Sequence, residues 1–184
     1  MKKLLLITGD LATGKSTFAE ILSRRYGCIV LYKDKIKEVL GDTVGAKDRE
    51  ENLRLSLGTV ALMAHIFSQL THTSCDAILE ANFKEGELKN LNAIAKNAGY
   101  DVLTLDFRAE MDIIYKRFVN RIENENRHPV HVSGFDGYDS LKYYIERARE
   151  QKITGRIITV DANDFSYQTN PDLLKEIDKF METI

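Results

Sequence analysis

The chain has 184 residues, and its 26 basic and 28 acidic side chains leave a formal net charge of −2. Hydrophobic residues make up 43% of the chain, whereas glycine contributes 11 residues and proline 2. This profile is that of one soluble globular domain with a sizeable core, and it excludes a disordered tail and a collagen-like chain. No apolar run approaches the roughly 18 residues of a membrane span, and the near-zero charge disfavours a dedicated nucleic-acid binder.

The two cysteines and the N-terminal run bear on the cellular location. Cys28 and Cys75 form neither a disulfide framework nor a paired metal spacing, and both adjoin apolar stretches. We therefore expect two reduced thiols in the core of a cytoplasmic protein. The apolar run that begins near Met1 stops after Ile7, at Thr8, which is too early for the apolar segment of a signal peptide. The run predicts a buried strand instead.

Short apolar runs alternate along the chain with segments of helical periodicity. The apolar runs predict strands over residues 3–8, 28–32, 76–81, 100–107 and 156–161. The periodic segments predict helices over residues 16–26, 34–40, 50–71, 85–98, 110–125 and 139–151, and a final helix that opens at Asn170–Pro171. This alternation predicts an α/β fold of three α/β/α layers, with a five-stranded parallel sheet covered by helices on both faces. Residues 126–137 match neither pattern.

Two glycines in the predicted helices carry local expectations. Gly41 follows the segment 34–40 and is expected to end that helix. Gly58 lies within the segment 50–71, where a glycine costs helix stability and suggests close packing against a neighbour. We expect the phenylalanines and leucines of that same segment in the core. No repeat, linker or low-complexity stretch divides the chain, so one domain over residues 1–184 is enough.

The clearest motif is a glycine-rich loop between the first strand and the first helix. Residues 9–16 match the phosphate-loop pattern G-x-x-x-x-G-K-[ST] in its expected strand-to-helix context. Gly9 and Gly14 permit a tight loop whose N–H groups point inward at phosphate oxygens, helped by the positive end of the helix. Lys15 would bridge the β- and γ-phosphates, and the Ser16 hydroxyl would bind Mg²⁺. The predicted nucleotide contacts are Gly9, Asp10, Leu11, Ala12, Thr13, Gly14, Lys15, Ser16 and Thr17.

The stretch GDLATGKSTFA, residues 9–19, resembles the P-loop small-molecule kinases. Within these AAA-type ATP-binding proteins it is most similar to the group of chloramphenicol phosphotransferase, zeta-toxin-type kinases and the kinase half of polynucleotide kinase. The layout agrees over nearly the whole chain, although only the loop is highly specific. The resemblance implies the P-loop NTPase fold with ATP and Mg²⁺ as cofactors. Ala12 departs from the third glycine of many relatives, a change that we expect to ask little of the backbone.

Asp34 is the predicted catalytic base. It follows the apolar run 28–32 and therefore lies at the carboxyl end of a parallel strand, where open α/β sheets bind ligands. The resemblance implies a carboxylate here that accepts the proton of the acceptor hydroxyl as the new bond forms. The alternative is that Asp34 caps the helix that follows it, and both roles are compatible with one residue.

Glu80 ends the third strand, at the position of a Walker-B carboxylate that holds Mg²⁺, usually through water. The alternative is that Glu80 merely meets solvent at a strand end. Asn82 and Phe83 follow at the same sheet edge, and the resemblance suggests that they face the acceptor. Relatives also place acceptor contacts near the start of the third helix. The sequence does not choose among the basic residues there, of which Arg54 is our candidate.

Three arginines and the segment after them predict a helical lid over residues 117–137. Arg117 and Arg121 are four residues apart on a predicted helix and project from one face, and Arg127 opens the irregular stretch. In related kinases such a helix and loop form a lid whose arginines neutralise the transferring phosphoryl group and pack on the adenine. Planar, always-charged guanidinium groups suit both tasks. The alternative is a solvated helix face that pairs with nearby acidic residues.

The irregular stretch also contains two histidines and two candidate hinges. His128 and His131 flank a proline, and no cysteine or acidic cluster follows at ligand spacing. We therefore expect lid residues, with His128 near the acceptor, rather than a zinc site. Gly134 and Gly137 are the candidate hinges. In such folds the loop after the fifth strand, residues 159–164, borders the adenine.

Together these features predict an ATP-dependent phosphotransferase that moves the γ-phosphate to a hydroxyl of a small molecule. Its partner would be that acceptor, without membrane or nucleic acid, in a monomer or homodimer. A regulatory GTPase would carry an N-K-x-D signature and a transport ATPase an acidic pair after the third strand, and the chain has neither. A non-catalytic or regulatory nucleotide-binding ATPase and a polynucleotide kinase-like enzyme stay open as alternatives. The predicted catalytic residues are Lys15, Asp34, Arg117 and Arg121.

Overall fold

The computed structural model describes residues 1–124, 127–131 and 135–182. The strands are β1 (Lys2–Gly9), β2 (Ile29–Tyr32), β3 (Ala77–Glu80), β4 (Tyr100–Arg108) and β5 (Arg156–Asp161). The helices are α1 (Lys15–Tyr26), α2 (Lys33–Thr43), α3 (Arg49–Leu70), α4 (Glu85–Asn97), α5 (Met111–Asn124), α6 (Tyr138–Arg149) and α7 (Pro171–Glu182), with a 3₁₀ turn at Ser166–Gln168. Every element that the sequence predicts is present, with its ends shifted by a few residues at most.

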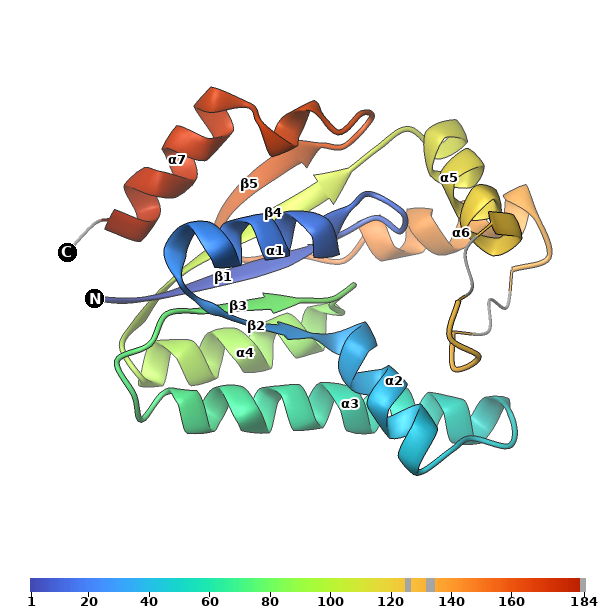
Figure 1. Ribbon diagram of the computed structural model, residues 1–184, viewed down its shortest axis with the longest axis horizontal. Helices are drawn as coiled ribbons and strands as arrows, with labels where there is room; N and C mark the ends of the chain where they lie inside the picture. The colour runs from blue at the N-terminus through green and yellow to red at the C-terminus, as the bar shows by residue number, and fades with distance from the viewer. Residues whose placement is uncertain (125–126, 132–134, 183–184) are drawn as a thin grey trace.

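The strands form one parallel sheet in the order β2-β3-β1-β4-β5, which confirms the predicted five-stranded parallel sheet (Figure 1). The central strand β1 pairs with β4 along its whole length and with β3 over residues 4–7. The carboxyl ends of all strands therefore meet at one edge of the sheet. The loop after β1, the start of α2 and the end of β3 lie side by side at this edge.

Side chains alternate across β1 and build one core on each face of the sheet. Leu5 and Ile7 pack with residues of α1 and α7, whereas Leu4 and Leu6 pack with residues of α3 and α4. Because both faces are covered, β1 is apolar at consecutive positions rather than at alternate ones. The result is the predicted three-layer arrangement, and α5 and α6 lie beyond the carboxyl ends of the strands (Figure 1).

The segment over residues 127–131 lies on α2 and the start of α3. The Val130 carbonyl accepts hydrogen bonds from Lys37 Nζ and from Asn52 Nδ2, each at 3.1 Å. Two side-chain pairs join the same segment to α2, His128 Nε2 to Asp42 Oδ1 at 2.9 Å and His131 Nε2 to Glu38 Oε1 at 2.8 Å. The predicted lid also includes residues 125–126 and 132–134, with the candidate hinge Gly134, and these lie outside the described residues.

Gly41 and Gly58 differ from their predicted roles. Helix α2 does not end at Gly41 but continues to Thr43. A β-carbon on Gly41 would lie 3.0 Å from Val130 Cγ2, so this glycine lets the segment 127–131 approach the helix. Nothing lies within 4 Å of a β-carbon built on Gly58, so the close packing expected there is wrong.

Two core assignments from the sequence are also wrong. Both thiols are free, but only Cys28 is buried, because Cys75 lies in the exposed turn between α3 and β3. In α3, Leu53 and Leu57 are 56% and 53% exposed, because the helix turns only one face toward the sheet. Among the described residues, α3 is the one helix long and apolar enough to cross a membrane by length and composition. This is weak evidence for a membrane span, because a core helix passes the same test and α3 packs Phe67 into the core.

Candidate active site

The loop between β1 and α1 turns back sharply, and both glycines of its motif are needed for that path. The Asp10 N–H donates to the Phe107 carbonyl of β4 at 2.8 Å. A β-carbon on Gly9 would lie 2.2 Å from that same oxygen, so the close approach requires glycine. Gly14 has a φ of 79°, and a β-carbon there would lie 2.4 Å from the Tyr167 hydroxyl. The glycines therefore fix a tight loop packed between β4 and the 3₁₀ turn.

Ala12 has a left-handed backbone conformation, which disfavours any residue with a β-carbon. Its φ is 56°, and it is the one non-glycine residue with positive φ in the described part of the chain. The left-handed region costs an L-residue about 1–2 kcal/mol. The expectation that Ala12 asks little of the backbone is therefore wrong, and the third glycine of many relatives has a conformational explanation.

Lys15 is the first residue of α1 and is buried within the loop. Its ammonium donates to the Asp10 carbonyl and, at 3.5 Å, to the Thr13 hydroxyl. Burial lowers the pKa of Lys15, and the negative charges of Glu80, Asp10 and Asp34 oppose that effect. The loop thus holds a buried ammonium group, which donates to one carbonyl and one hydroxyl of the loop itself.

Ser16 and Glu80, the two predicted metal ligands, are in contact. The Ser16 hydroxyl donates to Glu80 Oε2 at 3.0 Å. Glu80 is 6% exposed, so the alternative of a solvent-facing strand end is wrong. Burial raises the pKa of Glu80, while the charge of Lys15 and the Ser16 hydrogen bond lower it. Hydroxyl and carboxylate oxygens suit Mg²⁺. In the described ranges, no group of three His, Cys, Asp or Glu is placed to hold a metal ion.

Asp34 lies in the first turn of α2, at the same sheet edge. The helix begins at Lys33 with Tyr32 as its N-cap, so the alternative role of Asp34 as the helix cap is wrong. The Asp34 carboxylate is 61% exposed and lies 3.8 Å from Lys33 Nζ. Its charge contributes to raising the pKa of both Lys15 and Glu80, the effect of a carboxylate at the same sheet edge.

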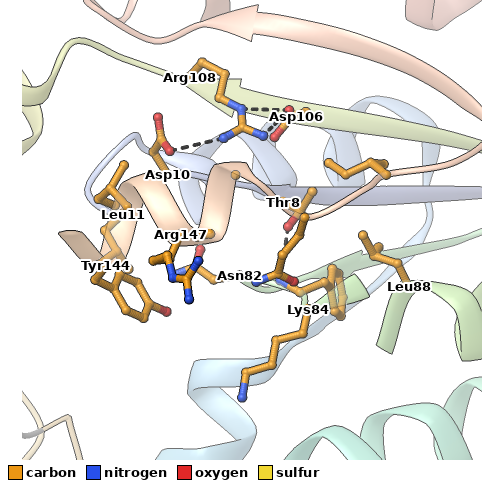
Figure 2. Close-up of a pocket in the computed structure, with 16 residues that line it drawn as sticks. Thr8, Asp10, Leu11, Asn82, Lys84, Leu88, Asp106, Arg108, Tyr144 and Arg147 are labelled. Atoms are coloured by element: carbon orange, nitrogen blue, oxygen red, sulfur yellow. Dashed lines mark hydrogen bonds and ion pairs between the residues drawn. The ribbon is translucent and has the colours of Figure 1, made fainter. Parts of the chain in front are cut away.

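Asn82 and Phe83 follow β3 but have different surroundings. Asn82 lines a cavity beside the start of the phosphate loop (Figure 2). Phe83 is 8% exposed and packs in the core beneath α3 and α4, and its N–H donates to the Thr8 hydroxyl at 3.1 Å. Phe83 also lines that cavity, so both residues border it, although Phe83 is packed more deeply.

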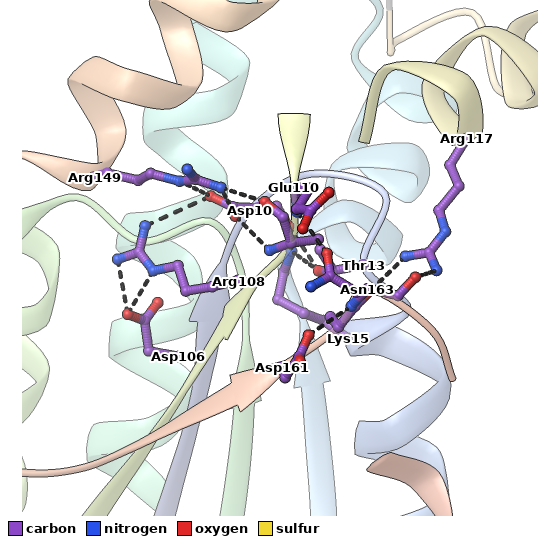
Figure 3. A network of polar contacts seen from close by, with 12 residues as sticks. Asp10, Thr13, Lys15, Asp106, Arg108, Glu110, Arg117, Arg149, Asp161 and Asn163 are labelled. Atoms are coloured by element: carbon purple, nitrogen blue, oxygen red, sulfur yellow. Dashed lines mark hydrogen bonds and ion pairs between the residues drawn. The ribbon is translucent and has the colours of Figure 1, made fainter. Parts of the chain in front are cut away.

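The two arginines of α5 reach different parts of the site. Arg117 donates to the carbonyls of residues 162 and 163, at 2.7 and 2.9 Å, and its guanidinium lies 4.3 Å from the ring centre of Phe165 (Figure 3). Phe165 is half exposed and lies against the phosphate loop. The charge of Arg121 adds to the effect of burial in lowering the pKa of Lys15. Arg117 thus joins α5 to the loop after β5.

The Asp10 side chain is held by two arginines, Arg149 and Arg108, that no sequence motif marks. Its carboxylate accepts hydrogen bonds from Arg149 at 2.6 and 3.1 Å and from the Ala109 N–H at 3.1 Å (Figure 3). Arg108 lies 3.5 Å away and also pairs with Asp106 at 2.7 Å. Asp10 therefore contributes its backbone to the loop, while its carboxylate anchors the loop to α6 and the end of β4. No local sequence signal marks this pair, because 139 residues separate Asp10 from Arg149.

The remaining candidates lie apart from the phosphate loop. Arg54 is 73% exposed and pairs with Glu50 at 2.6 Å on the outer surface of α3. His128 forms a hydrogen bond with Asp42 on α2. It follows Arg127 in the segment 127–131, which we call the docked segment because it lies on α2 and α3. The residues that the structure brings together at the loop are Lys15, Ser16, Asp34, Glu80 and Arg121.

A family model described as an AAA domain matches residues 4–140, which is more than half of the chain. The chain belongs to this AAA-domain family. Among proteins with curated descriptions, none matches this AAA domain. Its P-loop fold recurs in a candidate kinase from Chloroflexus aurantiacus J-10-fl, with a TM-score of 0.84 and 24% identity over 99% of both chains.

Two further solved structures share the fold of this AAA domain at lower similarity. A sugar kinase from Janibacter sp. HTCC2649 has a TM-score of 0.63 and 13% identity over 100% of both chains. A gluconokinase from Sinorhizobium meliloti 1021 has a TM-score of 0.60 and 11% identity over 98% of both chains. The family match and these neighbours confirm the predicted resemblance of the fold to that of P-loop small-molecule kinases.

Proposed function

We propose that this AAA domain is an ATP-dependent kinase that transfers the γ-phosphate to a hydroxyl group of a small molecule. The observation that carries the proposal is the meeting of three features at one sheet edge: a phosphate loop with a buried lysine, the Ser16–Glu80 pair, and the exposed carboxylate of Asp34. The names of the structural neighbours, which include a sugar kinase and a gluconokinase, point to the same reaction class.

Lys15 and the loop N–H groups would bind the polyphosphate. Lys15 Nζ donates to the Asp10 carbonyl in this structure, and phosphate oxygens would replace that weaker acceptor. Ser16 and Glu80 would hold Mg²⁺, which neutralises charge on the β- and γ-phosphate oxygens when it is bound. The charge of Arg121, close to Lys15, would act on the same oxygens.

Asp34 would act on the acceptor. As an exposed carboxylate facing Lys15 and Glu80, it is accessible to a hydroxyl that enters from solvent, orients that hydroxyl toward the γ-phosphate and takes its proton. On the opposite side, the half-exposed Phe165 under Arg117 would provide a flat apolar wall for the adenine.

The test compares Asp34→Asn with the parent protein in two assays. We expect ATP binding, measured by titration calorimetry with Mg²⁺, to persist, and acceptor-stimulated ADP release to fall on the order of 100-fold or more. Asp172→Asn is the matched control, because Asp172 is also an exposed first-turn acid, on the far helix α7.

Three outcomes would contradict parts of the proposal. Near-parental turnover by Asp34→Asn would remove the base role. If no acceptor raised ADP release above background hydrolysis, the alternative of a non-catalytic nucleotide-binding protein would replace the kinase. If the parent protein bound neither ATP nor GTP, and Lys15→Ala changed nothing, nucleotide binding itself would be wrong.

A further inference from the structure

One face of the sheet changes from apolar to polar at its carboxyl end. On β1, alternation places Leu4, Leu6 and then Thr8 on the face that α3 and α4 cover. On the neighbouring β4, Asp106 and Arg108 point to this same face, opposite to the buried core residues between them. Asp106 is 6% exposed. A buried carboxylate on a face that is otherwise core costs free energy unless its oxygens are paired and hydrogen-bonded.

A cavity of about 130 Å³ opens where this polar strip meets α6 (Figure 2). Its walls come from the start of the phosphate loop, residues 9–11, from residues 82–84 after β3, and from the last turns of α6 with Gln151 just beyond it. At about 30 Å³ per water molecule, it has room for about four waters, or for a polar fragment of similar size. The cavity is therefore large enough to hold part of a small molecule.

Asp106, one of the residues that line this cavity, has a buried oxygen atom without a partner among the described residues. Asp106 Oδ2 pairs with the Arg108 guanidinium. Oδ1 is buried and accepts no hydrogen bond from any described residue. Leaving such an acceptor without a donor costs about 1–3 kcal/mol, and more for a charged group. Figure 2 shows the Asn82 amide on the other side of the same space. A ligand that donates a hydrogen bond to Oδ1 would remove this cost.

The cavity lies next to the centre where the phosphoryl group would be transferred. Residues 9–11 belong both to the cavity wall and to the phosphate loop. Burial raises the pKa of Asp106, whereas the charge and the hydrogen bond of Arg108 lower it. Tyr144 on α6 lines the cavity on the opposite side from β4. The cavity thus lies between α6 and Asp106 and borders the phosphate loop.

The charges around the cavity favour a neutral hydroxyl over an ammonium group as the donor. Asp10 and Asp106 are each paired with arginine, so neither is an uncompensated negative charge. Lys84 and Arg147 also line the wall and add positive charge. An ammonium ligand would be repelled by these cations, whereas a hydroxyl can donate to Asp106 Oδ1 and accept from a cation.

We infer that this cavity binds the part of the acceptor remote from the transferred hydroxyl, and that Asp106 selects polyhydroxylated acceptors over apolar alcohols. The inference rests on the proposed kinase function and specifies the substrate class of that same site. A polyol or sugar would place one hydroxyl near Asp34 and a second hydroxyl on Asp106 Oδ1. Asp106 would act as a specificity residue that contacts substrate without taking part in the proton transfer.

The test uses glycerol, glucose and gluconate as probes, with cyclohexanol as the apolar comparison. Binding is measured by calorimetry in the presence of ADP and Mg²⁺, and acceptor-stimulated ADP release is measured with ATP. In Asp106→Asn, the amide oxygen can serve either Arg108 or the cavity, but not both. We expect the KM and the dissociation constant of the best polyhydroxylated probe to rise at least tenfold.

A second variant keeps the test independent of the Asp106–Arg108 pair. Ala148→Phe fills the cavity from α6 and leaves both partners of the pair in place. We expect the same loss of affinity for the probe, whereas Asp172→Asn on α7 should leave it unchanged. Thermal unfolding of each variant separates a lost contact from a lost fold.

The outcomes separate this inference from the proposed function. If a probe stimulates ADP release and neither Asp106→Asn nor Ala148→Phe changes its KM, the inference is overturned while the kinase stands. If cyclohexanol is preferred over every polyhydroxylated probe, or no probe binds the parent protein at millimolar concentration, the inference is likewise overturned. If a polyol binds the parent protein, binds both variants more weakly, and is never phosphorylated, the cavity assignment stands and the kinase proposal fails.

Discussion

The phosphate loop and the docked segment 127–131 flank the same sheet edge, but they are held in different ways. Buried groups hold the loop, with the Asp10 carboxylate on Arg149 and the Tyr167 hydroxyl on the Thr13 carbonyl at 2.8 Å. The segment is held by its Val130 carbonyl and by histidines paired with acids on α2 that are 39% and 72% exposed. Exposed pairs contribute about 0–1 kcal/mol each, whereas breaking a buried pair costs several. The loop is therefore a rigid cradle, whereas the segment depends on partly exposed pairs and on the buried hydrogen bond from Lys37 to Val130.

The largest expected effect comes from breaking the anchor of the loop. Arg149→Ala leaves the buried Asp10 carboxylate with only Arg108 and one N–H, and should lower the free energy of unfolding by about 2–3 kcal/mol. This is less than for a fully buried pair, because Arg149 is 35% exposed. Urea unfolding measures the change. Arg147→Ala is the control on the same helix, because its pair with Glu150 is 63% exposed on both sides, and it should change stability by less than about 0.5 kcal/mol. Equal losses would contradict the contrast.

Glu80→Gln should weaken the binding of Mg²⁺-ATP and raise the free energy of unfolding at neutral pH. Burial raises the pKa of Glu80 above its ordinary 4.5, so the folded state holds more protons than the unfolded state just above that pH. The free energy of unfolding of the parent therefore falls as pH rises through this window, and the cost remains in full above it. The variant should lose this pH dependence, exceed the parent in stability at neutral pH, and bind Mg²⁺-ATP about 10- to 100-fold more weakly. Urea unfolding between pH 4 and 8 and calorimetry measure the two effects, and a variant less stable than the parent at neutral pH would contradict the account.

A pair of glycine substitutions compares the docked segment with open helix surface. Gly58→Ala meets nothing within 4 Å and should raise the free energy of unfolding by up to about 1 kcal/mol. Gly41→Ala brings a β-carbon to 3.0 Å from Val130, so part of that gain is lost and the segment is pushed from α2. Trypsin should then cut after Arg127 several-fold faster in Gly41→Ala alone. Equal cleavage in both variants would show that Val130 does not hold the segment in place.

The smallest expected effect is at Ala12. Ala12→Gly removes the strain of a φ of 56° but adds backbone freedom to the unfolded chain, so we expect a net gain of about 0.5 kcal/mol. Thermal unfolding with and without ATP measures the change. A loss of stability would show that the left-handed backbone at this position carries little strain.

Local sequence patterns predicted the structural features that are determined by residues close together in the sequence. The strand–loop–helix unit around Gly9 and Lys15 was predictable, because the motif and the apolar run lie within a few residues of each other. Contacts across the chain were not. Gly41 was interpreted as a helix end because its partner, Val130, lies far along the sequence, and the Asp10–Arg149 pair spans 139 residues. The same holds for Cys75, whose apolar neighbours gave no hint that the turn around it faces solvent.

The supports of the phosphate loop lie late in the chain. Residues 10–14 belong to the first tenth of the sequence, whereas Arg149 and Tyr167 both come after residue 140, where the match to the family model ends. On the ribosome, the loop is therefore made long before the groups that hold its shape. A nascent chain has its nucleotide motif early but completes the cradle only when the last strand and the 3₁₀ turn have emerged, so ATP cannot template the early stages of folding.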